Sequence, residues 1–190
     1  MKRFLVVLTA LVLLFALTGC MSLSGTETGE EYMEDVDAKG NYGSWRKAYY
    51  LNDFRKSTGV PYIKTVCDGS YSNDSVRDAE LKATVMCDRD DVKIELLEDG
   101  EKLLSLENGK KASITVKILA DNKEIGLGNG TYDSKTRYIL LSSTLDLFEA
   151  LVENRSVLMH ITIEDGGETS TYLFKIFGYG FEYCYQQTFR

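Results

Sequence analysis

Apolar and polar residues alternate along most of the chain from Ser44 onward, in short runs that turn residues separate. Between 81 and 87, for example, Leu, Ala, Val and Cys alternate with Lys, Thr and Met. Such a period of two is typical of a strand with one buried face. The pattern predicts strands at 62–67, 81–87, 92–96, 103–106, 114–118, 138–142, 157–163 and 171–177. Turns are expected at 75–78, 98–101, 120–123, 133–136 and 165–168.

Two positions at the start of this pattern are less regular. Residues 45–51 fit a strand or a short helix, and we favour the strand. Pro61 has no backbone N–H to give to a sheet, so we expect it at the start of the strand that follows.

The segment SSTLDLFEALVENRS breaks the alternation. Ser143 or Thr144 can cap a helix, and Asp146 would fall in its first turn, where its charge suits the helix dipole. The residues Leu145, Phe148, Leu151 and Val152 share one face at helical spacing. We therefore predict one short α-helix of about three turns, at about 144–154, laid across an open end of the sheets. The aromatic tail YGFEYCYQQ should dock on the domain.

Short strands with closely spaced turns and one helix predict a mainly β fold. We expect an antiparallel β-sandwich or a barrel-like domain, built as a single domain from 44 to 190. The 12 Tyr and 8 Phe, with a single Pro, suit this class.

The first twenty residues, MKRFLVVLTALVLLFALTGC, have a different character. Lys2 and Arg3 precede an uncharged run, 4–17, that would span roughly 21 Å as a helix, whereas a bilayer core is about 30 Å thick. A basic start, a short apolar core and small residues are typical of a secretory signal. The alternative is a plain membrane anchor or a buried helix.

The end of that run, Leu-Thr-Gly-Cys at 17–20, resembles the lipobox of bacterial lipoproteins. The resemblance implies that Cys20 carries a diacylglyceryl group on its sulfur and that the signal peptide, 1–19, is removed. Stable attachment takes two or more acyl chains, and the new amine is usually acylated in that family. Met21 stands where many lipoproteins kept at the inner membrane have aspartate, which favours the outer membrane in a source that has one.

Residues 21–41 contain six acidic side chains and few aliphatic ones. Such a segment buries too little apolar surface to offset its ordering entropy. We expect 20–43 to be the lipidated N-terminus and a flexible acidic tether.

The charge balance restricts the partners. Loss of Lys2 and Arg3 with the signal leaves 20 basic side chains against 29 acidic ones. This excess argues against nucleic acid, which is bound through clustered Lys and Arg, and against a second, electrostatic attachment to anionic lipid.

Three further cysteines bear on the redox state. If the turn between the strands around Cys67 and Cys87 lies at 75–78, the two sulfurs should face each other, and in an oxidising envelope we expect a disulfide of roughly 3 kcal/mol. The alternative is two reduced, buried thiols. Cys184 is then left over, and we favour a buried, inert thiol over a link between two molecules.

No recognisable catalytic set emerges. Gly126, Gly128 and Gly130 lack the following helix of a nucleotide loop and should instead allow close approach to one strand face. His160 is the only histidine, and the chain has no G-x-S-x-G motif that would supply a nucleophilic serine beside it. One histidine and scattered thiols are also too few ligands for a typical zinc site. The acidic runs 68–78 and 88–91 do not match a calcium loop. We expect no cofactor, no metal site and no catalytic residue.

Around Trp45 to Leu97 the chain resembles a loosely defined family of uncharacterised bacterial and phage-associated β domains. The resemblance rests on D-F-x-x-x-T-G-x-x-Y-I at 53–63 and G-x-Y-S-N at 69–73, with Arg55 and Lys56 where small or acidic residues are usual. It implies a structural role for these residues and no particular activity.

Three hypotheses follow for function. The first is a non-catalytic, lipid-anchored envelope protein whose β domain binds a protein or an envelope component. The second is an envelope hydrolase with a site assembled from scattered acids and hydroxyls. The third is a structural or inhibitory module that pairs through a sheet edge or an aromatic patch.

Overall fold

A computed structural model of the protein describes residues 44–190 except 53, 90 and 103–111. The expected signal peptide, tether and strand at 103–106 lie outside the described residues. The described elements are β1 (Arg46–Leu51), β2 (Ser57–Ser72), β3 (Ala79–Cys87), β4 (Val92–Glu98), β5 (Glu101–Lys102), β6 (Ser113–Ala120), β7 (Lys123–Asp133), β8 (Tyr138–Leu141), α2 (Leu145–Val152), β9 (Ser156–Asp165), β10 (Glu168–Phe177) and α3 (Phe181–Phe189).

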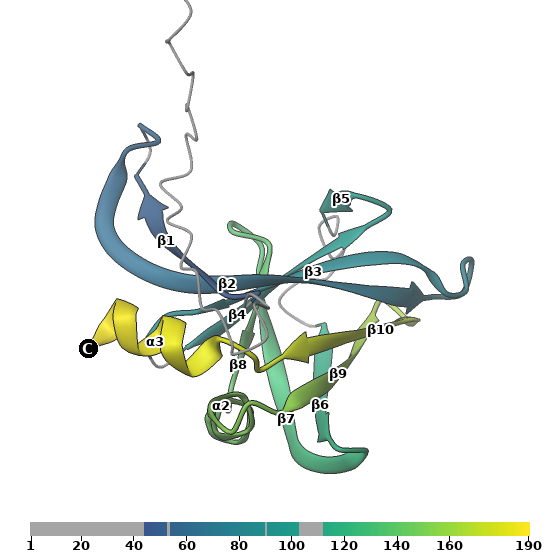
Figure 1. The fold of residues 1–190 in the computed structure, drawn as a ribbon. Coiled ribbons are helices and arrows are strands. Elements are labelled where there is room, and N and C mark those ends of the chain that lie inside the picture. Colours follow the sequence, from purple (N-terminus) through teal and green to yellow (C-terminus); the bar gives the residue numbers. More distant parts are fainter. Residues whose placement is uncertain (1–43, 53, 90, 103–111) are drawn as a thin grey trace, which may run out of the picture.

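The sheet is antiparallel and closes into an eight-stranded barrel (Figure 1). The ring runs β2-β10-β9-β6-β7-β8-β4-β3 and returns to β2, while β1 adds to β2 and β5 adds to β4. The predicted mainly β, antiparallel fold is therefore confirmed, and of the two forms expected, sandwich or barrel, the chain adopts the barrel. The strands predicted within the described residues are all present, and the strand expected at 45–51 is β1.

Strand β2 closes the ring because its 16 residues reach three partners. Its first part pairs with β1, the stretch from Ile63 to Tyr71 pairs with β3, and the last residues, from Gly69 to Ser72, pair with β10. Gly69 lies where β10 comes closest, since a side chain there would fall on the carbonyl oxygen of Leu173. The glycine of the G-x-Y-S-N motif thus permits the contact between these strands.

Side chains fill the barrel. An eight-stranded barrel encloses a space just wide enough for the residues that point inward. Alternate residues of each long strand supply them, and the core includes Ile63, Leu81, Val85, Ile94, Leu96, Ile118, Met159, Ile161, Tyr172 and Phe174, all at most 5% exposed. The interior is therefore a packed core.

Pro61 does not begin its strand, contrary to expectation, but is the fifth residue of β2. It pairs with Tyr49 of β1, and pairing with β3 begins only at Ile63. Because β2 has a single neighbour at Pro61, the missing N–H removes no bond to a second strand. A register shift between Tyr49 and Leu51 also leaves Leu51 exposed, whereas Ala48 is buried.

Two helices lie together beside the barrel, where one was predicted (Figure 1). Helix α2 begins after Thr144 and has Asp146 in its first turn, as expected, but it ends at Val152 and is nearer two turns than three. Its buried residues are Leu147, Ala150 and Leu151. Leu145 and Val152, predicted to be on the inner face, are 66% and 43% exposed, since the helix presents the adjacent stripe to the core.

The aromatic tail docks, as predicted, and forms α3. Phe181 is fully buried and packs edge-on against Trp45, with 4.9 Å between the ring centroids. The indole N–H of Trp45 donates a hydrogen bond of 2.8 Å to the carbonyl of Phe177. Phe148 of α2 and Tyr185 of α3 extend the cluster. These rings join the two helices to the start of β1.

Of the three alternate glycines of β7, Gly126 and Gly130 allow a close approach, but the approaching groups are not the aromatic ring or second backbone that we expected. A methyl group on Gly130 would come within 2.7 Å of Ile139 Cγ2 and 2.8 Å of Ile114 Cγ2. At Gly126 it would meet the Asp146 carboxylate at 3.2 Å, and at Gly128 the nearest atom, Ser142 Oγ, would be 3.7 Å away. The approaching groups are aliphatic side chains and the start of α2.

Gly130 is tightly surrounded and Gly128 is not, so alanine at the two positions should have different effects on stability. Gly130→Ala should lower the free energy of unfolding by about 1–3 kcal/mol, because the β-branched neighbours are stiff and cannot yield. Gly128→Ala should be neutral or stabilising by up to about 0.5 kcal/mol, since the methyl fits and the unfolded chain loses entropy. Urea denaturation of the two variants measures both changes. Equal stabilities would contradict the packing described here.

Candidate binding groove

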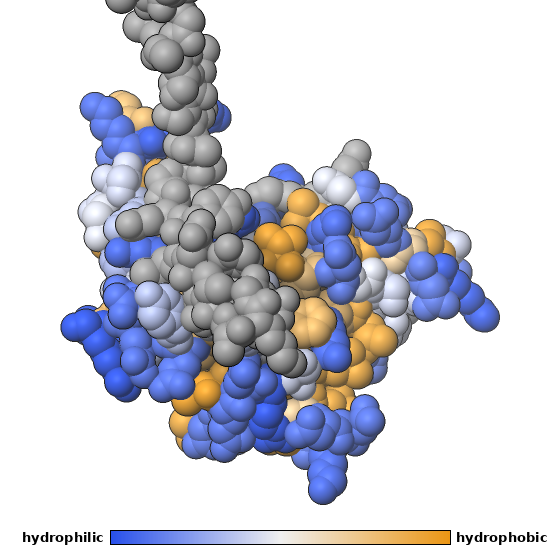
Figure 2. Space-filling model, in the orientation of Figure 1, coloured by the Kyte–Doolittle hydropathy of each residue, from blue (hydrophilic) through white to orange (hydrophobic). Residues whose placement is uncertain are grey.

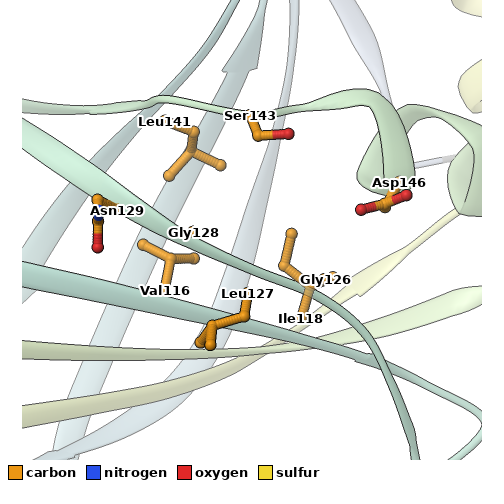
Figure 3. A pocket seen from close by; sticks show the side chains of 9 residues that line it. All are labelled: Val116, Ile118, Gly126, Leu127, Gly128, Asn129, Leu141, Ser143 and Asp146. Atoms are coloured by element: carbon orange, nitrogen blue, oxygen red, sulfur yellow. The ribbon is translucent and has the colours of Figure 1, made fainter.

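The described cavity that enters the barrel wall is too small for a ligand. It has a volume of about 10 Å³ and lies beside the glycines of β7, between Val116, Leu141 and Asp146 (Figure 3). A cavity of this size holds about one water molecule. Among the described residues, a larger hollow lies on the outer surface.

One outward row crosses four strands of the barrel. Lys64 on β2 pairs with Met86 on β3, Met86 pairs with Lys93 on β4, and Lys93 pairs with Leu140 on β8. Each alternates with a buried neighbour along its strand, so all four side chains stand on the outer face. Met86 is nevertheless only 4% exposed, which places it at the bottom of a depression.

Two hairpins raise the walls of this depression. On one side are Tyr49, Tyr50, Leu51 and Tyr62 from the β1–β2 hairpin, and on the other are Asp133, Thr136 and Tyr138 around the β7–β8 turn. Together with the row from Lys64 to Leu140 they enclose an open groove of about 770 Å³. We call it the tyrosine groove. Its volume lies within the range of sites that take small molecules.

A hydrogen-bonded set of three polar residues supports one wall. The Tyr50 hydroxyl donates to Asp88 Oδ2 at 2.8 Å. Lys93 Nζ donates to the same oxygen and to the Tyr50 hydroxyl, both at 2.7 Å. Lys93 Nζ also lies 4.8 Å from the centroid of the Tyr50 ring, and that ring packs at 4.6 Å from Tyr62. These contacts orient Tyr50 before any ligand binds.

Neither Tyr50 nor Lys93 has a pKa suited to proton transfer near neutral pH. Burial, with the hydrogen bond to Asp88, raises the pKa of Tyr50 to about 12. Burial acts to lower the pKa of Lys93, but its hydrogen bonds to Asp88 and Tyr50 outweigh that effect and the pKa rises. Tyr50 therefore stays protonated and Lys93 stays charged, whereas a general acid or base works best with a pKa near the operating pH.

The other candidates from the sequence lie elsewhere. His160 stands on the outer face of β9, paired with Lys117 and Leu173, away from the groove. In the part of the chain that the structure describes, no group of three His, Cys, Asp or Glu side chains could hold a metal ion. Asp88, from the acidic run 88–91, is engaged by Tyr50 and Lys93.

The register corrects the expected arrangement of Cys67 and Cys87. The turn lies near the expected place, but Cys67 pairs with Ala83, and Cys87 pairs with Ile63. The two cysteines are thus four positions apart along the ladder, roughly 13 Å, and a disulfide needs Cα atoms within about 7 Å. Both are buried thiols, and burial raises the pKa of Cys67 to about 12 and that of Cys87 further. Cys184 is also buried, as expected.

Fold and groove together define a small antiparallel β-barrel with a filled interior and an aromatic groove on its outer surface. Comparison with protein-family models, with curated proteins and with solved structures finds no match for this chain. Within the described residues, no helix is long and apolar enough to cross a membrane.

Sequence reasoning did not find the groove, because its residues come from six strands and are adjacent only after the barrel closes. One signal was present. Met86 is a large apolar residue on the otherwise polar side of a strand that alternates regularly. An apolar residue in such a position marks either a covered surface or a binding surface.

The tyrosines provide a prediction for alkaline pH. The pKa of Tyr71 is raised to about 12 by its hydrogen bond to Asp99 and by burial, and the pKa of Tyr172 is raised by burial and by its bond to Glu98. In the folded protein the hydroxyls of Tyr50, Tyr71 and Tyr172 should still be protonated at about pH 10, where the tyrosines of an unfolded chain ionise. The free energy of unfolding should therefore fall as pH rises from about 10 to about 12.

Ultraviolet absorbance at high pH measures this ionisation. Tyr50→Phe should remove one tyrosine from the late step and make the fall in stability less steep. A late step unchanged in this variant would contradict the assignment of Tyr50.

Proposed function

We propose that the chain is a lipid-anchored protein of the bacterial envelope, and that its β-barrel binds a protein or an envelope component through the tyrosine groove. The anchor is inferred from the Leu-Thr-Gly-Cys sequence at 17–20, with Cys20 as the lipidated residue. The outer membrane is the favoured location in a source that has one. The observation that carries the binding role is the outward row from Lys64 to Leu140, set between walls of tyrosine.

The lining favours recognition over chemistry. Four tyrosines supply large, rigid surfaces with a polar end, and such rings give contact area at a low cost in side-chain entropy. Lys64 and Asp133 add one charge of each sign. Met86 and Leu140 supply an apolar floor. A lining that is mostly apolar and aromatic, with a small number of placed polar groups, is typical of ligand sites.

The hydrolase alternative finds less support in this geometry. Among the described residues that line the groove, Asp133 is the one carboxylate. Acid–base hydrolysis uses two groups whose pKa values are pushed apart. We therefore give precedence to binding.

The anchor is tested by metabolic labelling with palmitate. The protein should incorporate label and fractionate with membranes, and Cys20→Ala should abolish incorporation, because the thiol accepts the lipid. Cys184→Ala is the matched control and should retain the label. Equal labelling of Cys20→Ala and the native protein would refute the anchor.

The groove is tested by photo-crosslinking in intact cells. A photoreactive amino acid at Leu140 or at Leu51, 36% and 40% exposed, should trap the same adduct, since both line the groove. The control position is Leu127, which is 63% exposed on β7 and outside the groove. Mass spectrometry then identifies the adduct. Adducts that form equally from Leu127 would contradict a role for the groove.

A further inference from the structure

The β1–β2 hairpin differs in charge from the rest of the chain. Between Arg46 and Lys64 there are five basic residues and one acidic one, whereas the whole chain has a net charge of −7. The basic residues are Arg46, Lys47, Arg55, Lys56 and Lys64. The overall acidic balance therefore conceals one locally basic element.

This hairpin also leaves the barrel. In Figure 1 its tip stands away from the closed sheet, at the end of the strongly bent β2. Figure 2 shows that its surface is largely hydrophilic, with apolar surface at the tip. Phe54, at the turn, is 83% exposed, and Val60 further along is 54% exposed.

Hydrogen bonds from Asn52 fix the backbone of the turn that carries Phe54. The Asn52 side-chain oxygen accepts hydrogen bonds of 3.0 Å from the backbone N–H groups of Phe54 and Lys56. The backbone of Asn52 bonds to Lys56 at 2.9 Å and to Arg55 at 2.8 Å. Arg55 has a φ of 56°, a conformation in which glycine or asparagine is the usual residue. The chain thus places a cation at a position where glycine or asparagine would fit with less strain.

We propose that this hairpin tip is a membrane-contacting element, in which Phe54 enters the boundary between the headgroups and acyl chains of an anionic bilayer while Arg55 and Lys56 lie among the lipid phosphates. Basic residues beside an exposed aromatic ring are the composition of interfacial membrane segments. Tyr49, Tyr50 and Tyr62 stand behind the tip, and tyrosine rings suit the headgroup level of a membrane.

A lipid surface fits these observations better than a protein partner does. The local charge of the hairpin is opposite to that of anionic headgroups, and the single ring at the tip suits a fluid surface better than a shaped pocket. Strand β1 begins at Arg46, and the tip follows its last residue, Leu51. The tip therefore lies about one strand length, roughly 20 Å, from the start of β1. The inference uses no property of Cys20 and can stand or fail separately from the proposed anchor.

The test places a fluorescent reporter at the tip. Phe54→Trp in the full chain, reconstituted into vesicles of phosphatidylcholine and phosphatidylglycerol, should show blue-shifted emission and quenching by lipids brominated on the acyl chain. Trp45 is the only native tryptophan and is 2% exposed, so it contributes a constant background. The matched control is Leu127→Trp, at an exposed position of another strand.

Charge reversal completes the test. Adding Arg55→Glu and Lys56→Glu to the reporter should reduce its quenching severalfold, whereas Lys123→Glu with Lys175→Glu, the same change in charge at two other exposed positions, should leave it unaltered. Circular dichroism confirms that each variant is folded. A reporter at position 54 that is quenched no more than the one at position 127, or that responds equally to both pairs of substitutions, would overturn the proposal and leave Phe54 as a contact for a protein.

Discussion

Strand β2 pairs with β1, β3 and β10, and this sharing closes the barrel. With 16 residues, β2 is long enough to pair with three strands, and it bends along its length (Figure 1). At Gly69 the backbone of β10 comes too near for any side chain. At its other end, the bent first part of β2 leaves the ring and pairs with β1 alone (Figure 1). One long strand thus takes part in both the closed core and the projecting hairpin.

The closed core determines where recognition can occur. Eight strands leave an interior that aliphatic and aromatic side chains fill, so binding is confined to the outer face. There, the hairpin and the β7–β8 turn stand on either side of the row from Lys64 to Leu140. The bonds among Tyr50, Asp88 and Lys93 hold one wall in position, which reduces the ordering that a ligand would have to impose.

Local patterns predicted the strands well because the period of two reflects a face that is buried throughout. The hairpin of β9 and β10 is the clearest case, since alternation on both sides of Gly166 and Gly167 left one reasonable pairing. Register between β2 and β3 was a harder question. Six residues, 73–78, connect these strands, and the position of the turn alone did not determine the register, in which Cys67 lies opposite Ala83 and not Cys87. Helix α3 was recognised only as an aromatic tail, because its contacts with Trp45 and Phe148 come from distant parts of the chain.

The groove and the basic hairpin were beyond such patterns for different reasons. The groove depends on which outward residues become neighbours across strands, and this is a property of topology. The charge of the hairpin was visible in the sequence, but averaging over the whole chain concealed it. Net charge describes a surface only when its charges are evenly distributed.

The pairing of β2 with β10 also has a consequence for the order of folding. Residues about 100 positions apart must meet before the ring is complete, since Ser72 pairs with Thr171. Contacts so distant in sequence form late, after the loops between them have closed. A nascent chain that lacks its last twenty or so residues therefore cannot form this pairing, and the ring of strands stays open until synthesis is almost finished.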